Sequence, residues 1–197
     1  MKNFRILLLV ALVVLAASPA SSQPGNSTVG LAWSLTMPTG DMKEFTDDFS
    51  LRGVNLEYRR FKRSDLAFGL NVGFNVFNDD KDNTFIGENF AVTGQRWTYI
   101  NTVPIYASVF KFSGNKRDGR MFFGANAGTA WLEQRNTLGL YETVESNWHL
   151  ALAPEIGYNF PWDAFLGYAS VRYNYLFEAG EVPAQGWFEL KLGFGLD

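Results

Sequence analysis

The stretch "LAFGLNVGFNVF", Leu66 to Phe77, alternates between two kinds of side chain. One set is bulky and apolar, and the other is small or carries an amide: Leu66, Phe68, Leu70, Val72, Phe74 and Val76 against Ala67, Gly69, Asn71, Gly73 and Asn75. Alternation with a period of two predicts an extended strand with two different faces. A soluble sheet would carry Lys, Glu and Thr on its solvent face, whereas Gly, Ala and Asn suit a crowded interior. The pattern therefore favours a strand with its apolar face outward and its small, polar face inward.

Seven further segments show similar alternation and are separated by sequence rich in turn residues. They run over Val29 to Met37, Gly53 to Phe61, Arg96 to Phe112, Met121 to Arg135, Trp148 to Phe160, Phe165 to Phe177 and Phe188 to Leu196. The faces are least clear in the segment from Arg96 to Phe112, because Val103, Ile105 and Val109 oppose Tyr106 and Phe110. The sequence therefore predicts an all-β fold of about eight strands.

The connections between these segments alternate in length. "KRSD", "SGNKRDGR" and "PWD" are short, whereas "PTGDMKEFTDDFS", "NDDKDNTFIGENFAVTGQ", "NTLGLYETVES" and "EAGEVPAQG" are mostly longer and more acidic. Short turns at one end and long loops at the other are typical of an antiparallel up-and-down transmembrane β-barrel, with the long loops outside the cell and both termini in the periplasm. The longest connection, Asn78 to Gln95, is expected to be a loop outside the membrane.

Aromatic residues are expected to form two belts, at the outer and the periplasmic membrane interface. In this orientation the outer belt contains Trp97, Tyr99, Trp131, Trp148, Tyr175 and Phe188, and the periplasmic belt contains Tyr58, Phe61, Phe112, Phe123, Tyr158, Phe160 and Phe165.

The N-terminal sequence has the layout of a secretory signal peptide. Lys2 and Arg5 precede an apolar run from Ile6 to Ala17, and the small-residue site Ser18-Pro19-Ala20 follows. We expect a signal peptide over residues 1–20 and one barrel domain over residues 21–197. The sequence has no cysteine, which excludes disulfides and a lipid-modified cysteine. A net charge of −3 gives no basic face for nucleic acid.

Six charged residues fall on the small-residue face of the predicted strands. They are three acids and three bases: Glu57, Glu155, Glu189, Arg59, Arg172 and Lys191. Charges inside a narrow barrel are costly unless they are paired. About eight strands leave an interior just wide enough for side chains, so we expect an ion-pair network that plugs the lumen rather than a gated polar conduit.

No catalytic, cofactor or metal site is predicted. His149 is the only histidine, and a Ser-His-acid unit would need a nucleophile within hydrogen-bond reach. The next residue on its face, Ala151, is not one, although Ser146 or a serine on another strand stays an alternative. The acidic run "NDDKDN", Asn78 to Asn83, lacks the glycine and the bidentate glutamate of a calcium loop.

Three segments resemble the small outer-membrane β-barrel proteins related to the OmpA transmembrane domain and OmpX. "SLTMPTGDMKEF" is similar to the family's first strand and loop, "TVPIYASVFKF" to its fourth strand and "FELKLGFGL" to its closing strand. The resemblance implies a place in the cell outer membrane of a Gram-negative bacterium, among outer-membrane lipid and lipopolysaccharide, with the barrel insertion machinery as a partner. Such barrels commonly end in an aromatic residue, whereas this sequence ends Leu196-Asp197.

The predicted function is structural or surface-interacting, with an extracellular partner bound through the loops, and is not enzymatic. One alternative is porin-like transport of small solutes or hydrophobic molecules, which measured conductance or a lateral opening would favour. A lipid A-modifying barrel enzyme is a second alternative, and a secreted soluble barrel with an internal ligand is a third.

Overall fold

The computed structural model describes residues 27–196 except residues 47, 88, 89, 116, 117, 139, 140, 163, 164 and 181. For residues 44, 80–96, 138 and 141 it describes the backbone alone. The expected signal peptide, residues 1–20, lies outside the described residues.

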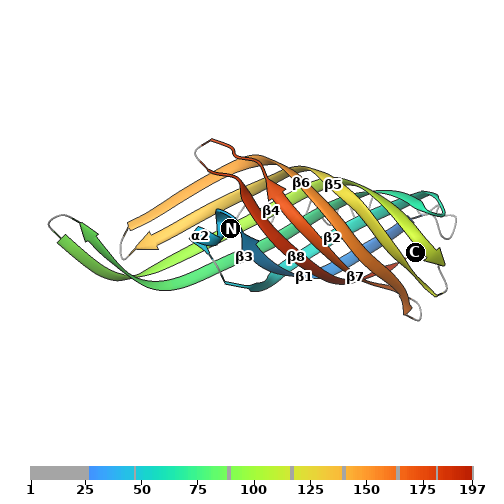
Figure 1. Cartoon of the computed structure of the whole chain (residues 1–197), viewed down its shortest axis with the longest axis horizontal. Coiled ribbons are helices and arrows are strands. Elements are labelled where there is room, and N and C mark those ends of the chain that lie inside the picture. The colour runs from blue at the N-terminus through green and yellow to red at the C-terminus, as the bar shows by residue number, and fades with distance from the viewer. Residues whose placement is uncertain are drawn as a thin grey trace, which may run out of the picture.

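Eight antiparallel strands form one closed barrel in the order of the chain (Figure 1). They are β1 Ser27–Thr39, β2 Ser50–Arg63, β3 Leu66–Gly87, β4 Phe90–Asn115, β5 Gly119–Leu138, β6 Tyr141–Trp162, β7 Phe165–Leu176 and β8 Gln185–Leu196. A short helix, α2 (Met42–Phe45), lies between β1 and β2. Each strand pairs with the next, and β1 closes the ring by pairing with β8. The predicted fold class, an antiparallel up-and-down barrel of about eight strands, is confirmed.

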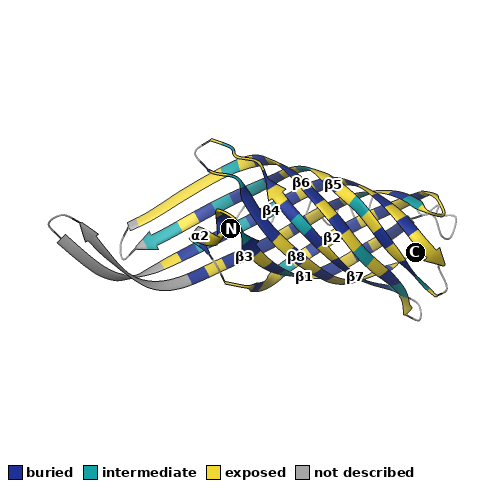
Figure 2. Ribbon diagram, viewed as in Figure 1, coloured by how far each residue is buried: buried dark blue, intermediate teal, exposed yellow. Residues whose placement is uncertain are grey.

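The barrel wall has its apolar face outward. In β3, Leu70 is 60% exposed and Phe74 44%, whereas Asn71 and Asn75 are buried. Figure 2 shows the resulting alternation of buried and exposed residues along the strands. An exposed band of this composition is stable only against hydrocarbon, because contact between so much apolar surface and water is unfavourable. Among the described residues, no helix is long and apolar enough to cross a membrane.

The strand with unclear faces, β4, follows the same rule. Ile105 and Val109 are exposed on the outer face, and Tyr106 and Phe110 are buried in the interior. The large inward side chains of β4 lie opposite glycines of β5, since Tyr106 pairs with Gly128 and Phe110 with Gly124. Bulky and minimal side chains thus alternate around the ring, which lets aromatic rings fit into a narrow lumen.

Two members of the expected periplasmic belt lie inside the barrel instead. Phe61 is 9% exposed and Phe112 is 3% exposed. Phe61 shares the inward face of β2 with Arg59, so its position in the strand decides its direction despite its place near the rim. Phe165, which is 48% exposed, and Tyr158 do face outward at this end.

The expected loop from Asn78 to Gln95 is wrong in its secondary structure. The backbone continues β3 and β4 as a paired hairpin, with Asn78 opposite Tyr99 and Gly87 opposite Phe90. The segment "NTLGLYETVES" is likewise paired, since Leu138 lies opposite Tyr141. Outside a membrane neither face of a sheet has to be apolar, so strand pairing persists where hydrophobic alternation is lost.

Four strands therefore extend beyond the closed ring. A membrane-spanning strand needs only about 9–11 residues, whereas β3 has 22 and β4 has 26. β2 pairs with β3 only as far as Asn75, and β7 pairs with β6 only from Ala151. The remaining parts of β3, β4, β5 and β6 project from one end of the barrel (Figure 1). We call them the projecting sheet: residues 78–87, 90–101, 132–138 and 141–150.

The orientation of the apolar face has a direct test in Phe74. Phe74→Arg should lower the free energy of unfolding by about 2–4 kcal/mol, because a cation in the wall must leave water for hydrocarbon. Phe74→Leu is the matched control and should cost far less, as should Asn75→Ser on the inner face. Urea unfolding in phospholipid vesicles measures all three. Equal tolerance of arginine and leucine would show that Phe74 does not face lipid.

Candidate functional site in the barrel lumen

The six charged residues predicted for the lumen lie together at mid-height in the barrel. Glu57 and Arg59 come from β2, Glu155 from β6, Arg172 from β7, and Glu189 and Lys191 from β8. Strand register brings several of them together, because Arg172 lies directly opposite both Glu155 and Glu189. All six are 5% exposed or less.

Arg172 is the most connected member of this network. Its Nη2 donates to Glu189 Oε2 at 2.9 Å and to Asn55 Oδ1 at 2.7 Å, and its Nε donates to Glu189 Oε2 at 3.1 Å. Its Nη1 donates to Asn71 Oδ1 at 2.8 Å and lies 3.9 Å from Glu155 Oε2. The guanidinium also lies 5.4 Å from the ring centre of Tyr106. Five N–H donors in a rigid fork suit such a many-sided site, which a lysine could not fill.

The remaining charges continue the network with alternating sign. Lys191 Nζ donates to Glu57 and lies 2.7 Å from Glu155 Oε1. Arg59 Nη2 donates to Glu57 Oε2 at 2.6 Å and lies 3.8 Å from Glu155 Oε1. Each carboxylate therefore has at least one cation beside it, which offsets the cost of removing these charges from water.

Neutral side chains supply further hydrogen bonds that sequence reasoning missed. The amide of Asn55 donates to Glu189 at 2.6 Å, that of Asn174 donates to Glu189 at 2.9 Å, and that of Asn71 donates to Glu57 at 3.2 Å. Glu155 accepts from Ser170 at 2.8 Å and from Asn126 at 3.2 Å. All these residues occupy inward positions of the alternation, which is the signal that could have identified them.

An aromatic layer lies between the network and the short-turn end of the barrel. It contains Phe61, Ala67, Phe110, Phe112 and Phe122. The guanidinium of Arg59 lies 4.6 Å from the ring centre of Phe110 and 4.5 Å from that of Phe122. A cation over aromatic faces is favourable where water is excluded.

An apolar layer lies on the other side of the network, toward the projecting sheet. It includes Phe77, Ile100, Leu132, Leu176 and Trp187, and Met42 of α2 belongs to the same cluster. The rings of Phe77 and Trp187 meet edge to face with centroids 5.8 Å apart. Three layers thus fill the lumen. The cavity beside Glu57 and Arg59 measures about 10 Å³, which leaves room for about one water molecule.

His149 does not form a catalytic unit with Ser146. It is 1% exposed, and its Nδ1 donates to the backbone carbonyl of Phe177 at 2.8 Å. Ser146 is exposed and lies an odd number of residues away, on the opposite face of β6. No serine or carboxylate hydrogen bond to His149 occurs within the described part of the chain. The side chains of Asp80 to Asn83 lie outside the described residues, and no group of metal-ligating side chains forms among those that are described.

Comparison with solved structures identifies the fold. The Neisserial surface protein A, NspA, matches with a TM-score of 0.55 and 14% identity over 87% of this chain and 97% of the other. Ail, the attachment invasion locus protein of Yersinia pestis, matches with a TM-score of 0.50 and 16% identity over 87% of this chain and 99% of the other. No protein-family model matches the sequence, and no curated protein does.

The chain has the fold of the small outer-membrane β-barrels, as the resemblance in the sequence implied. Its closed ring and its outward apolar face agree with a place in the cell outer membrane. The short connections, the start of β1 and the end of β8 all lie at the same end of the barrel, since Val29 near the start of β1 pairs with Leu196 at the end of β8. In an outer-membrane barrel this is the periplasmic end.

Removal of Arg172 tests the energetics of the lumen. Arg172→Ala should lower the free energy of unfolding by about 3–5 kcal/mol, because Glu189 and Glu155 would lose a buried partner. Lys43→Ala, at an exposed position of α2, is the control and should have little effect. Adding Glu189→Gln to Arg172→Ala should restore part of the loss. Additive energies in this double-mutant cycle would contradict a direct coupling between the two side chains.

Proposed function

We propose that the chain is a closed outer-membrane barrel that anchors the projecting sheet outside the cell and presents it to a binding partner. The observation that carries the proposal is the combination of a lumen filled at three levels with four strands that continue past the ring. A filled lumen supports an anchor, and strands that exceed the membrane thickness support a surface role.

The projecting sheet offers one edge for strand addition. Among the described residues, β6 forms no strand pair with β7 before Ala151, and its outermost backbone hydrogen bond on that side is from Phe177 N to Leu150 O at 2.9 Å. From Glu142 to Ser146 every side chain is exposed, on both faces of the strand. An unpaired strand edge exposes backbone N–H and C=O groups that an extended segment of another protein can pair with. Glu142 and Glu145 add negative charge beside this edge. Of these two, Glu142 forms an ion pair with Arg135 at 3.2 Å, and Glu145 forms none among the described residues. These features fit an extended partner segment with basic side chains.

Transport of small solutes is the alternative function. It needs a continuous hydrated path, whereas this lumen contains paired charges between an aromatic and an apolar layer. Enzymatic modification of lipid A receives no support from the hydrogen bonding of His149. Both arguments favour the surface-interaction role, with lipid and lipopolysaccharide surrounding the barrel.

Removing most of the projecting β3–β4 hairpin tests this function. Replacement of residues 79–93 by a short Gly/Ser turn should leave membrane insertion and heat-modifiable gel mobility intact, because the hairpin lies outside the closed ring. The same change should abolish binding of the nanodisc-embedded protein to intact cells, because it removes much of the projecting sheet that presents the partner's binding edge. As a control, replacing Ser64 and Asp65 in the periplasmic turn by Asn-Gly should preserve binding. Loss of folding in the hairpin variant, or full binding by it, would contradict the proposal.

We also propose that residues 1–20 are an export signal and that residues 21–197 form the mature barrel domain. The apolar run and the small residues up to Ala20 support cleavage at that position. The mass of the protein isolated from outer membranes should equal that of residues 21–197. A mass that includes Met1 to Ala20 would contradict the proposal.

A further inference from the structure

A groove of about 640 Å³ runs along the outer wall of the barrel. Its centre is formed by the small residues Ala125 and Pro154, which lie opposite each other on β5 and β6. Larger outward side chains flank this centre, among them Phe123 and Ile156, which are 56% and 53% exposed. The groove is therefore a hollow in the lipid-facing surface, with walls of aromatic and branched side chains.

Pro154 explains why the hollow lies at this place. β6 pairs with β7 through Leu152 with Tyr175 and again through Glu155 with Arg172, but Ala153 and Pro154 form no pair with β7. Proline has no N–H to donate to a strand ladder, and it is rare inside sheets for that reason. The compact ring of Pro154 and the small side chain of Ala125 opposite it leave a gap between the larger outward side chains of β5 and β6. The floor of the groove reaches Glu155, whose carboxylate is held from the lumen by Ser170 and Lys191.

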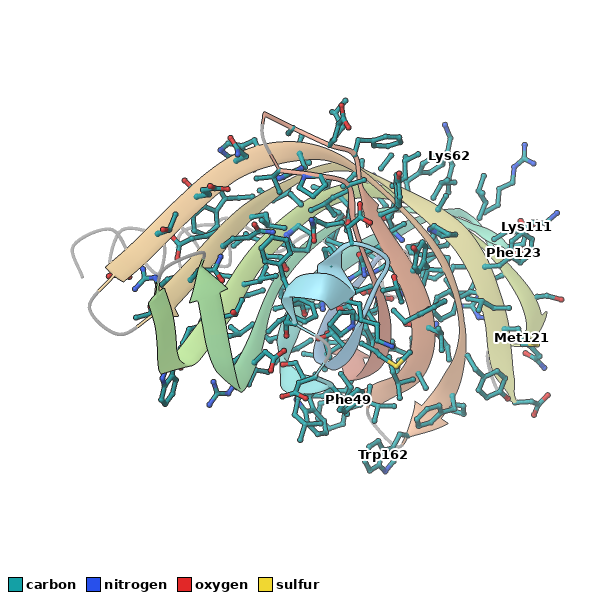
Figure 3. All side chains as sticks on the ribbon, turned by 60° about the vertical axis from the view of Figure 1, so that its left-hand side comes forward. Phe49, Lys62, Lys111, Met121, Phe123 and Trp162 are labelled. Carbon is teal, nitrogen blue, oxygen red and sulfur yellow. The ribbon has the colours of Figure 1, made fainter. Side chains whose placement is uncertain are left out.

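A single cation borders the groove on the periplasmic half of the barrel. Lys111 lines it and lies opposite Leu66 on β3 and Phe123 on β5. Figure 3 shows Lys111 pointing away from the wall, as Lys62 of β2 does at the same end. Lys111 has no carboxylate partner among the described residues. An exposed lysine at a membrane interface extends its stem along apolar surface and places its ammonium among the headgroups.

We propose that this groove binds an anionic phospholipid of the periplasmic leaflet. The acyl chain lies against Pro154 and Ala125, and the headgroup phosphate lies at the ammonium of Lys111. Charge complementarity selects this occupant, because an apolar slot that leads to an unpaired cation matches one chain and one phosphate. A symmetric contact between two copies through the same face would instead bring two unpaired Lys111 side chains together. The proposal does not depend on the extracellular function.

Native mass spectrometry of the full protein, folded in detergent and titrated with phosphatidylglycerol or phosphatidylcholine, tests the proposal. The wild type should retain one phosphatidylglycerol in preference to phosphatidylcholine. Lys111→Gln should weaken phosphatidylglycerol binding about fivefold, the effect of one lysine near an anionic membrane surface. Ala125→Phe should abolish retention of both lipids by filling the centre of the groove.

Two variants on the same outer surface serve as controls. Lys62→Gln removes a rim cation that does not line the groove, and Ala107→Phe adds bulk at an outward position of β4 beyond it. Both should bind phosphatidylglycerol as the wild type does, and heat-modifiable mobility verifies that every variant is folded. Equal retention of the two lipids by the wild type would overturn the proposal. So would equal weakening by Lys62→Gln and Lys111→Gln, or a dimer mass that Ala125→Phe abolishes.

Discussion

The interaction on which the barrel depends is the contact of Arg172 with Glu189, at 2.9 Å and with both side chains fully buried. It joins β7 to β8 across the lumen side of the wall. The other hydrogen bonds of Arg172 reach Asn55 on β2 and Asn71 on β3, on the far side of the ring. A single guanidinium thus connects four of the eight strands through the interior. Because a buried charge without its partner is costly, this contact favours one register of the ring over any slipped alternative.

The two surroundings of the molecule, lipid around the ring and water past the membrane, explain the rest of the architecture. Lipid outside requires a closed ring, since an open sheet edge would leave backbone groups unpaired in hydrocarbon. A ring of eight strands leaves room for side chains and little else, so polar residues inside must satisfy one another. The network, the aromatic layer around Arg59 and the apolar layer around Trp187 together meet that requirement. Past the membrane neither constraint holds, and there β3 to β6 continue as a sheet with free edges.

The sequence was sufficient for the parts of the structure that hydrophobic alternation governs. Leu66 to Phe77 predicted the inverted faces, and the inward charges from Glu57 to Lys191 were identified by position in their strands.

The hairpin of Asn78 to Gln95 was missed because pairing outside the membrane leaves no apolar pattern. Phe61 and Phe112 do not belong to the expected periplasmic belt, because their positions in β2 and β4 direct them into the lumen although they lie near the rim. The amides of Asn55 and Asn174 were missed because their partners depend on contacts between strands that are distant in the sequence. The groove at Pro154 depends on the curvature and packing of six strands, which no local pattern encodes.

The most direct test of a closed lumen is ionic conductance in a planar bilayer. The wild-type barrel should give no stable conductance, because paired charges and two packed layers leave no hydrated path. A variant that removes the central side chains and keeps the charge balanced, Arg172→Ala with Glu189→Ala, should show conductance or increased leak if it still folds. Stable, ohmic conductance of the wild type would contradict the closed lumen and would favour transport as the function of this barrel.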